Sequence, residues 1–190
     1  QLAEAIVELA RQAPRKVLAL TEPRRMVPHA LRHPVHVAMV SVLLGQRFDL
    51  EGEVLVELAV CALCADAGKS ALDPDLRRPI ARLNADQRAI RSRHSVETVR
   101  QLLTMPELHP RLRRRLLVAF EQDLGDDLGG SPDVLRWSTR HPFSRIIGLA
   151  SIWDELRAAP GRRGTDPVAL AHALRDKQQG IHPRVLLDHL

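Results

Sequence analysis

The sequence is poor in aromatic residues and in cysteine. It has no tyrosine, three phenylalanines and two tryptophans, whereas proteins that bind single-stranded nucleic acid typically stack bases on aromatic rings beside a basic groove. Nucleic acid is therefore not an expected partner. Two cysteines cannot form a disulfide framework. We expect Cys61 and Cys64 to be small buried residues rather than a metal or redox pair.

Long hydrophobic runs are also missing. No apolar stretch reaches the ~20 residues that cross a bilayer, and no charged and then apolar leader is seen. We therefore expect no membrane insertion and a cytoplasmic location. The first residue is Gln rather than Met, so we expect this chain to be a piece of a longer protein.

The chain is nevertheless apolar enough to fold. Of its 190 residues 45% are apolar, which suffices for one domain with a sizeable core. The formal net charge is +5, and the arginines are spread widely with one cluster. We expect that cluster to be the solvated face of a helix rather than an anion or nucleic-acid patch; its members are Arg111, Arg113, Arg114 and Arg115.

Helical spacing of apolar residues recurs along the whole chain, and no convincing strand is seen. The predicted fold class is all-α, a single-domain bundle of about eight helices. We divide the chain into a helical lead-in, residues 1–24, and a helical domain, residues 25–190. Helices are expected over residues 2–11, 28–46, 51–67, 84–103, 110–124, 143–158 and 165–177, with a last short one from Pro183.

Several residues predict where these helices begin, bend and end. Pro34 should kink or restart the helix that contains it, and Gly68 should end the most apolar helix. Asn84 and Gln87 have the spacing of a capping box. Trp153 is expected in the core. The glycine-rich segments 125–132 and 160–164 read as loops.

Histidines and acids fall on helices that a bundle could bring together around a cavity. Histidine nitrogen and carboxylate oxygen suit Fe, Mn or Zn, and a bound ion could supply hydroxide for phosphoester hydrolysis. Each residue also has a plainer interpretation, because a helical histidine is more often exposed or hydrogen-bonded than a metal ligand. The candidates are His29, His33, Asp66, Lys69, His94, Glu121 and Asp154.

The order of several short motifs resembles that of HD-GYP domains. Residues 33–38, HPVHVA, resemble the opening H-S-x-R-V-A, and residues 66–69, DAGK, resemble the end of H-D-I-G-K. Residues 83–87, LNADQ, followed by His94, resemble L-T-x-E-E with its later H-P. Residues 144–154, SRIIGLASIWD, resemble A-R-I-x-x-V-A-D-x-F-D. Two closing motifs follow, at Asp166-Pro167 and at residues 180–183, GIHP, so the resemblance runs from about residue 25 to the end.

The resemblance implies a site and an activity. HD-GYP proteins are metal-dependent phosphodiesterases that open cyclic di-GMP, with two or three iron or manganese ions held by histidines and acids. Carried over, the resemblance puts His33, Asp66 and His94 at ligand positions and Lys69 at the site lysine. His29 stands where many members have a ligand glutamate.

Other positions depart from the family pattern. Two ions are not expected on the three or four ligands that remain. We expect Phe120 to fill the former site with apolar volume, and Pro34 to turn His29 and His33 off a common face. Ala65 replaces the histidine of the His-Asp pair, Ala119 and Phe120 replace the histidines of H-H-E before Glu121, Ser151 replaces an aspartate, and residues 127–132, DLGGSP, replace D-G-x-G-Y-P.

We therefore predict a catalytically inactive HD-GYP-like domain that acts as a regulatory or protein-interaction module in bacterial signalling. No cofactor is expected, another protein is the expected partner, and Asp66 should pair with Lys69 or a histidine. One alternative is a phosphodiesterase for cyclic di-GMP or another nucleotide, with one Fe or Mn ion and with Lys69 and Asp66 as catalytic residues. A second is a sensor that binds a nucleotide without hydrolysis. The remnant metal positions are His33, Asp66, His94 and, in addition, His29.

Overall fold

All regular structure in the described part of the chain is helical. The computed structural model describes residues 1–22, 27–104, 111–122 and 140–158. Within these ranges the α-helices are α1 (Leu2–Gln12), α2 (Pro14–Leu20), α3 (His29–Arg47), α4 (Gly52–Cys64), α5 (Ala85–Arg91), α6 (His94–Leu103), α7 (Leu112–Glu121) and α8 (Pro142–Ala158). Short 3-10 helices, η1 (Ala67–Ala71), η2 (Pro74–Arg77) and η3 (Ile80–Arg82), connect α4 to α5. The predicted all-α fold is confirmed.

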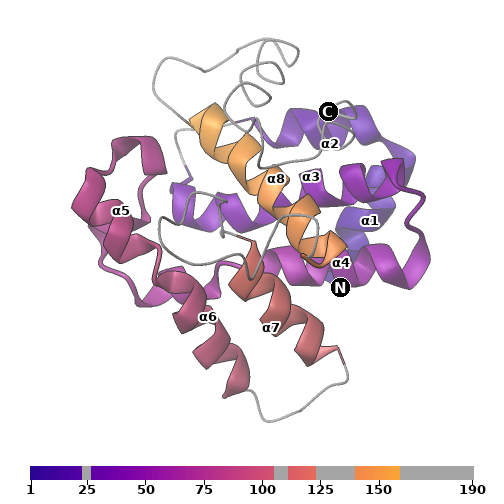
Figure 1. Ribbon diagram of the computed structural model, residues 1–190. Helices are drawn as coiled ribbons and strands as arrows, with labels where there is room; N and C mark the ends of the chain where they lie inside the picture. Colours follow the sequence, from indigo (N-terminus) through magenta and orange to yellow (C-terminus); the bar gives the residue numbers. More distant parts are fainter. Residues whose placement is uncertain (23–26, 105–110, 123–139, 159–190) are drawn as a thin grey trace.

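The main core lies between α1, α3, α4 and α8. α3 packs against α4 and α8, and α1 packs against α3 and α4; Figure 1 shows α8 crossing α3 near the middle of the molecule. Fully buried apolar side chains come from three of these helices, with Val40 on α3, Leu58 on α4 and Ile147 on α8. Burial of each such side chain contributes about 1.5–3 kcal/mol. Trp153 is 4% exposed and belongs to this core, as predicted.

The lead-in helix shares this core. Ala3, Ile6 and Ala10 are buried on α1 at helical spacing and belong to the same apolar cluster as the core residues of α3 and α4. The first helix was expected over residues 2–11 and is found over Leu2–Gln12. The division between residues 24 and 25 stays a prediction.

Two helix boundaries differ from the sequence expectations. α3 continues through Pro34 from His29 to Arg47, so the helix does not restart there. Pro34 is the sixth residue of α3, past the first turn, so it removes the one helical hydrogen bond to the Ala30 carbonyl oxygen, and this loss does not end the helix. Asn84 and Gln87 form the predicted capping box, but the expected single helix is divided at residues 92–93 into α5 and α6.

Gly68 has a different role from the one expected. α4 ends at Cys64, and Gly68 lies four residues later in η1. A Cβ atom at Gly68 would come within 2.2 Å of the His94 carbonyl oxygen and 2.4 Å of the Thr98 nitrogen. The Gly68 N–H also donates to Thr98 Oγ1 at 2.8 Å. Glycine is needed here because the backbones of η1 and α6 touch.

The arginine cluster on α7 is only partly a solvated face. Arg113 and Arg114 are exposed, as expected. Arg115 Nε and Nη2 instead lie 3.1 Å from the two carboxylate oxygens of Glu57, whose side chain is 2% exposed. Arg111 Nη2 contacts Glu53 Oε2 at 2.7 Å. Arg111 and Arg115 therefore connect α7 and the residue before it to α4 through ion pairs with Glu53 and Glu57.

Both cysteines are free, with Cys61 buried and Cys64 partly buried. Burial raises the pKa of both thiols. Thiols in such surroundings are poor nucleophiles. The predicted burial is confirmed for Cys61 and only in part for Cys64.

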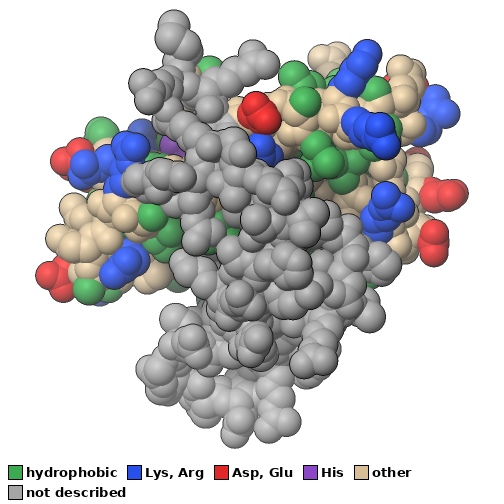
Figure 2. Space-filling view, turned by 90° about the horizontal axis from the view of Figure 1, so that it is seen from above, with side chains coloured by type: hydrophobic (Ala, Val, Ile, Leu, Met, Phe, Trp, Pro, Cys, Tyr) green, Lys and Arg blue, Asp and Glu red, His purple; other side chains and the backbone are tan. Residues whose placement is uncertain are grey.

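Lysine and arginine side chains are scattered on the face shown in Figure 2, on both sides of the view and with acids among them. Within the described residues, no helix is both long and apolar enough to cross a membrane. The loops expected at residues 125–132 and 160–164, the helix start at Pro110, the helix at residues 165–177 and the one from Pro183 lie outside the described residues.

A buried network of histidines and carboxylates

One face of α3 carries three histidines. His29, His33 and His36 lie at positions i, i+4 and i+7 of the helix, a spacing that aligns side chains along one face. The rings of His29 and His33 stack with centroids 4.8 Å apart and an interplanar angle of 26°. The expectation that Pro34 would turn these two residues off a common face is therefore wrong, since α3 is continuous through the proline.

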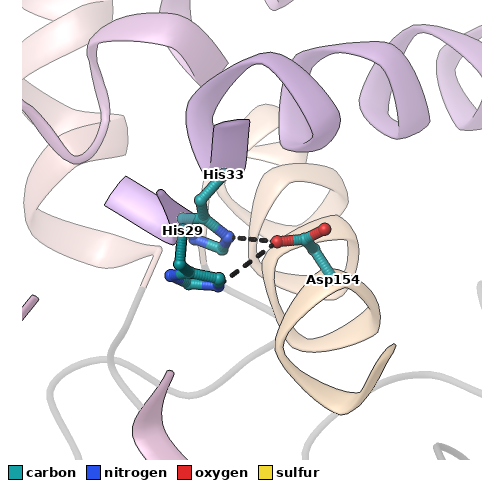
Figure 3. A group of neighbouring side chains, drawn as sticks. All are labelled: His29, His33 and Asp154. Atoms are coloured by element: carbon teal, nitrogen blue, oxygen red, sulfur yellow. Dashed lines mark hydrogen bonds and ion pairs between the residues drawn. The ribbon is translucent and has the colours of Figure 1, made fainter. Parts of the chain in front are cut away.

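Asp154 on α8 faces this row of histidines. Its side chain is 1% exposed. The His33 Nδ1–H donates to Asp154 Oδ2 at 2.6 Å, and the His36 Nδ1–H donates to Oδ1 at 2.8 Å. His29 Nε2 lies 3.6 Å from Oδ2, beyond a hydrogen bond (Figure 3). Asp154 thus joins α8 to α3 at the centre of the fold.

Asp66, in the turn between α4 and η1, receives donors on both carboxylate oxygens. Oδ2 lies 2.6 Å from Lys69 Nζ and 3.1 Å from His33 Nε2. Oδ1 lies 3.1 Å from both His94 Nε2 and Gln122 Nε2. A carboxylate has about four lone-pair sites, so these protein donors fill them. The predicted pairing of Asp66 with Lys69 or a histidine is confirmed.

His33 connects the two aspartates. Its two ring nitrogens face Asp154 and Asp66, so both donate and the ring carries a positive charge. Burial and the Lys69 ammonium lower the pKa of His33, but the hydrogen bonds to both aspartates outweigh them and raise the pKa to about 9. His94 also faces two acceptors, the Asp66 carboxylate and the Arg91 carbonyl oxygen at 2.7 Å.

The carboxylates are correspondingly held in their charged form. Burial raises the pKa of Asp66, whereas the Lys69 ammonium and the hydrogen bonds from His33 and His94 hold it well below its usual value. Burial also raises the pKa of Asp154, and the three histidines of α3 hold it well below its usual value. The groups that donate hydrogen bonds to Asp66 and Asp154 are therefore the same groups that stabilise the charged form of each carboxylate.

An outer layer extends the network to α5. Glu155, next to Asp154 on α8, accepts from Arg91 Nη2 at 2.5 Å and from the Ile80 N–H at 2.9 Å. Arg91 Nη1 also donates to the Arg78 carbonyl oxygen. Burial raises the pKa of Glu155, and nearby cations including His33 and Arg91 lower it overall.

The charges of the network balance without a metal ion. Three carboxylates, Asp66, Asp154 and Glu155, face at least three cations. A buried divalent cation is stabilised by surplus negative charge and by ligand atoms with free lone pairs. Asp66 and His33 offer neither, because their charges are matched and their polar atoms are already hydrogen-bonded. The residues present therefore do not fit a centre of two or three ions. The three cations are His33, Lys69 and Arg91.

One smaller set of donors has a spacing suited to a single ion. Ligand atoms of His29, His33 and Asp154 all lie within 4.8 Å of one another. Among the described residues, His29 Nε2 is buried and has no hydrogen-bond partner. Burial lowers the pKa of His29, and the Asp154 and Glu155 carboxylates oppose this only in part. The His29 ring is therefore neutral at pH 7 and keeps a lone pair.

The structure places some candidates of the sequence analysis together and others apart. Glu121 does not join the network. Its Oε2 accepts from the His141 N–H at 3.0 Å and from the Ser144 hydroxyl at 2.7 Å, so it caps the start of α8. Phe120 is 43% exposed and Ala119 is fully buried, so the expectation that Phe120 fills the site is wrong. The candidates that meet are His29, His33, Asp66, Lys69, His94 and Asp154.

Two partners in the network were not assigned a role from the sequence. His36 was noted only where a motif arginine was expected, although its i+7 spacing from His29 was a usable signal. Gln122 had no signal, because a glutamine at a helix end is common. Its amide donates to both the Ala65 carbonyl oxygen and Asp66, and two acceptors fix its orientation. Asp154 was a candidate acid but was left out of the final metal set.

Comparison with known proteins supports the fold. No protein-family model matches the chain, and no curated protein matches it. Among solved structures the chain is similar to Bd1817, an HDG"Y"P protein from Bdellovibrio bacteriovorus, with a TM-score of 0.78 and 18% sequence identity. The alignment covers 98% of this chain and 59% of Bd1817. The chain therefore has an HD-GYP-like fold, and it spans less than two thirds of that protein's length.

Proposed function

We propose that this chain is a catalytically inactive HD-GYP-like domain that acts by binding, as a regulatory or protein-interaction module in signalling. The observation that carries the proposal is the saturation of Asp66 by protein donors. Lys69 and His33 contact one carboxylate oxygen, and His94 and Gln122 contact the other. A metal ion could bind Asp66 only by displacing one of these donors.

The network joins separate helices, which is also the structural effect of a metal centre. It joins α3, the turn after α4, α6 and α8 through Asp66, His33, His94 and Asp154. Buried charges are retained when they are paired and hydrogen-bonded, and each of these groups has a partner. A fold held together in this way keeps its surfaces for partners without metal chemistry.

A second candidate function has one observation in its favour. His29, His33 and Asp154 could hold a single Fe or Mn ion, and His29 Nε2 is buried without a hydrogen-bond partner among the described residues. Such an ion would supply a hydroxide nucleophile for phosphodiester hydrolysis. His33 would first have to release its bond to Asp154 or to Asp66, which makes this the weaker candidate.

The proposal is tested by separating hydrolysis from function in the cell. With Mn²⁺ or Fe²⁺ added, we expect no hydrolysis of cyclic di-GMP or of bis(4-nitrophenyl) phosphate above the background of a matched Asp66→Asn variant. We also expect Asp66→Asn, and independently Lys69→Gln, to restore the wild-type phenotype to a strain that lacks the gene. Turnover that both substitutions abolish, together with failed restoration by folded variants, would establish the enzyme instead.

A further inference from the structure

A set of large apolar side chains on α6 and α7 is exposed rather than buried. The four side chains are between 39% and 55% exposed, and we call them the α6–α7 surface: Val96, Leu103, Leu117 and Phe120. Val99 and Leu116, which are partly buried, pack against the apolar cluster that the two helices share. Scattered exposed apolar residues are normal, whereas a contiguous group of them marks an interaction surface.

The members of the α6–α7 surface lie on one side of the helix pair. Figure 1 shows α6 and α7 running in opposite directions, and the two helices contact each other. Thr98 on α6 faces η1, because its Oγ1 accepts from the Gly68 N–H, and Arg115 on α7 faces Glu57 of α4. On each helix the exposed apolar residues are two and five positions from Thr98 or Arg115, so at about 100° per residue they point about 140–160° away from η1 or α4. Since η1 closely follows α4 in the chain, both helices present their exposed apolar residues on the opposite side of the pair.

The exposed charges on α6 and α7 are all positive. The exposed charged residues of the two helices are Arg100, Arg113 and Arg114. The acids are less accessible, because Glu97 is partly buried and lies 3.2 Å from Arg100, and Glu121 is buried. Arg100 and Arg113 are each four residues from an apolar member of the α6–α7 surface, so they lie in line with it. The surface therefore complements a partner that is apolar in the middle and acidic at its edges.

We propose that the α6–α7 surface binds an amphipathic helix of a partner protein, with an apolar face bordered by aspartate and glutamate. An amphipathic helix binds through apolar residues at i, i+3, i+4 and i+7, and its ridges pack between those of adjacent helices. A second copy of this chain would bring arginine against arginine, which is unfavourable. Surfaces that bind anionic membranes are rich in lysine and tryptophan, and α6 and α7 contain neither. The inference rests on the proposed binding role and gives it a surface and a partner chemistry.

The first experiment places the photocrosslinker p-benzoylphenylalanine at the position of Leu117 in the full-length protein, in the cells that naturally produce it. The matched control carries the crosslinker at the position of Val54, an apolar residue on α4 that is 46% exposed against 39% for Leu117. We expect an adduct from the Leu117 position alone, and mass spectrometry should locate the crosslink in an acidic amphipathic helix. No adduct, the same adduct from both positions, a crosslinked segment without that pattern, or an adduct with lipid or with a second copy would overturn the proposal.

The second experiment measures how tightly the crosslinked segment, made as a synthetic peptide, binds the purified protein. We expect Leu117→Glu to weaken binding at least about tenfold, because it buries a carboxylate against apolar side chains and acids, and Val54→Glu to leave binding unchanged. Arg113→Glu and added salt should both weaken binding, because the attraction to the acidic partner is lost or screened. All three residues are exposed, so the variants should keep the wild-type melting temperature. Equal binding by Leu117→Glu would refute the inference.

Failure of this inference can be told apart from failure of the proposed function. A wild-type protein that hydrolyses cyclic di-GMP and still forms the adduct at Leu117 would refute the proposed inactivity and leave this inference standing. An inactive protein whose Asp66→Asn variant restores the phenotype, but which forms no adduct at Leu117, would refute this inference alone.

Discussion

Replacing Asp154 by asparagine removes the charge at the centre of the network while keeping the size of the side chain. Asp154 is 1% exposed and accepts hydrogen bonds of 2.6 and 2.8 Å from His33 and His36. An asparagine amide keeps one acceptor oxygen, but its NH₂ group would face the second imidazole N–H. The substitution therefore leaves one buried imidazole N–H facing a donor and removes the carboxylate charge beside His33.

The expected loss of stability is large. Removing one partner of a buried ion pair costs about 3–5 kcal/mol, because the other charge stays buried and unmatched. For a domain of this size each kcal/mol lowers the melting temperature by about 2–4 °C, so Asp154→Asn should melt about 10 °C below wild type.

The assay is urea unfolding followed by circular dichroism, with and without EDTA. We expect the same loss in both conditions, since the proposed network needs no metal ion to balance its charges. The control is Asp75→Asn, because Asp75 is 76% exposed and lies 3.4 Å from Arg78; it should cost less than about 1 kcal/mol. If Asp154→Asn stayed within about 1 kcal/mol of wild type, or if EDTA alone destabilised wild type by as much as the substitution, the reasoning would be refuted.

Three further predictions concern pH and packing. Because the folded pKa of His33 is about 9 against a reference of 6.5, its contribution to stability is complete below about pH 6.5 and is lost as pH rises toward 9. The pKa values of Asp66 and Asp154 are lowered from 3.8, so their contribution is lost as pH falls below about 4, and a urea series should show the maximum between these limits. Gly68→Ala should destabilise by more than about 2 kcal/mol in the same assay, because its Cβ would overlap backbone atoms of α6. Glu121→Gln should cost about 1–2 kcal/mol through the weaker cap of α8.

The two substitutions have matched controls at exposed positions. Ser70→Ala, at an exposed position of η1, should change stability far less than Gly68→Ala; equal effects would contradict the backbone contact. Glu51→Gln, also exposed, should be nearly neutral beside Glu121→Gln. Stability that increases from pH 6.5 to 9 would contradict the charged His33, and it is the behaviour expected of a protein stabilised by a histidine-bound metal.

The overall fold could be predicted from the sequence because the patterns that indicate its helices are local in the chain. Apolar spacing located α1, α3, α4 and α8, and the Asn84 capping box was found as predicted. The break between α5 and α6 was not, since residues 92–93 carry no glycine or proline. Helix ends that depend on tertiary contacts have no local signal.

Only part of the site could be predicted from the sequence. The ordered motifs brought His33, Asp66, Lys69 and His94 to one place, and the structure unites them. Each residue along a helix turns the side chain by about 100°, so motif matching cannot decide which of two neighbours faces inward. That is why Phe120 was wrongly expected in the interior, where the neighbouring Ala119 is found. For the same reason the sequence did not predict that Asp154 lies at the centre of the buried network.

The most direct test of the central claim is the metal content of the protein, produced in medium supplemented with iron and manganese and purified without a chelator. In the network, the two carboxylates of Asp66 and Asp154 face the two cations of His33 and Lys69, so no surplus negative charge is left and we predict less than about 0.1 ion per chain by elemental analysis. Close to one ion per chain, lost in Asp154→Asn, would contradict the account and assign the site to His29, His33 and Asp154.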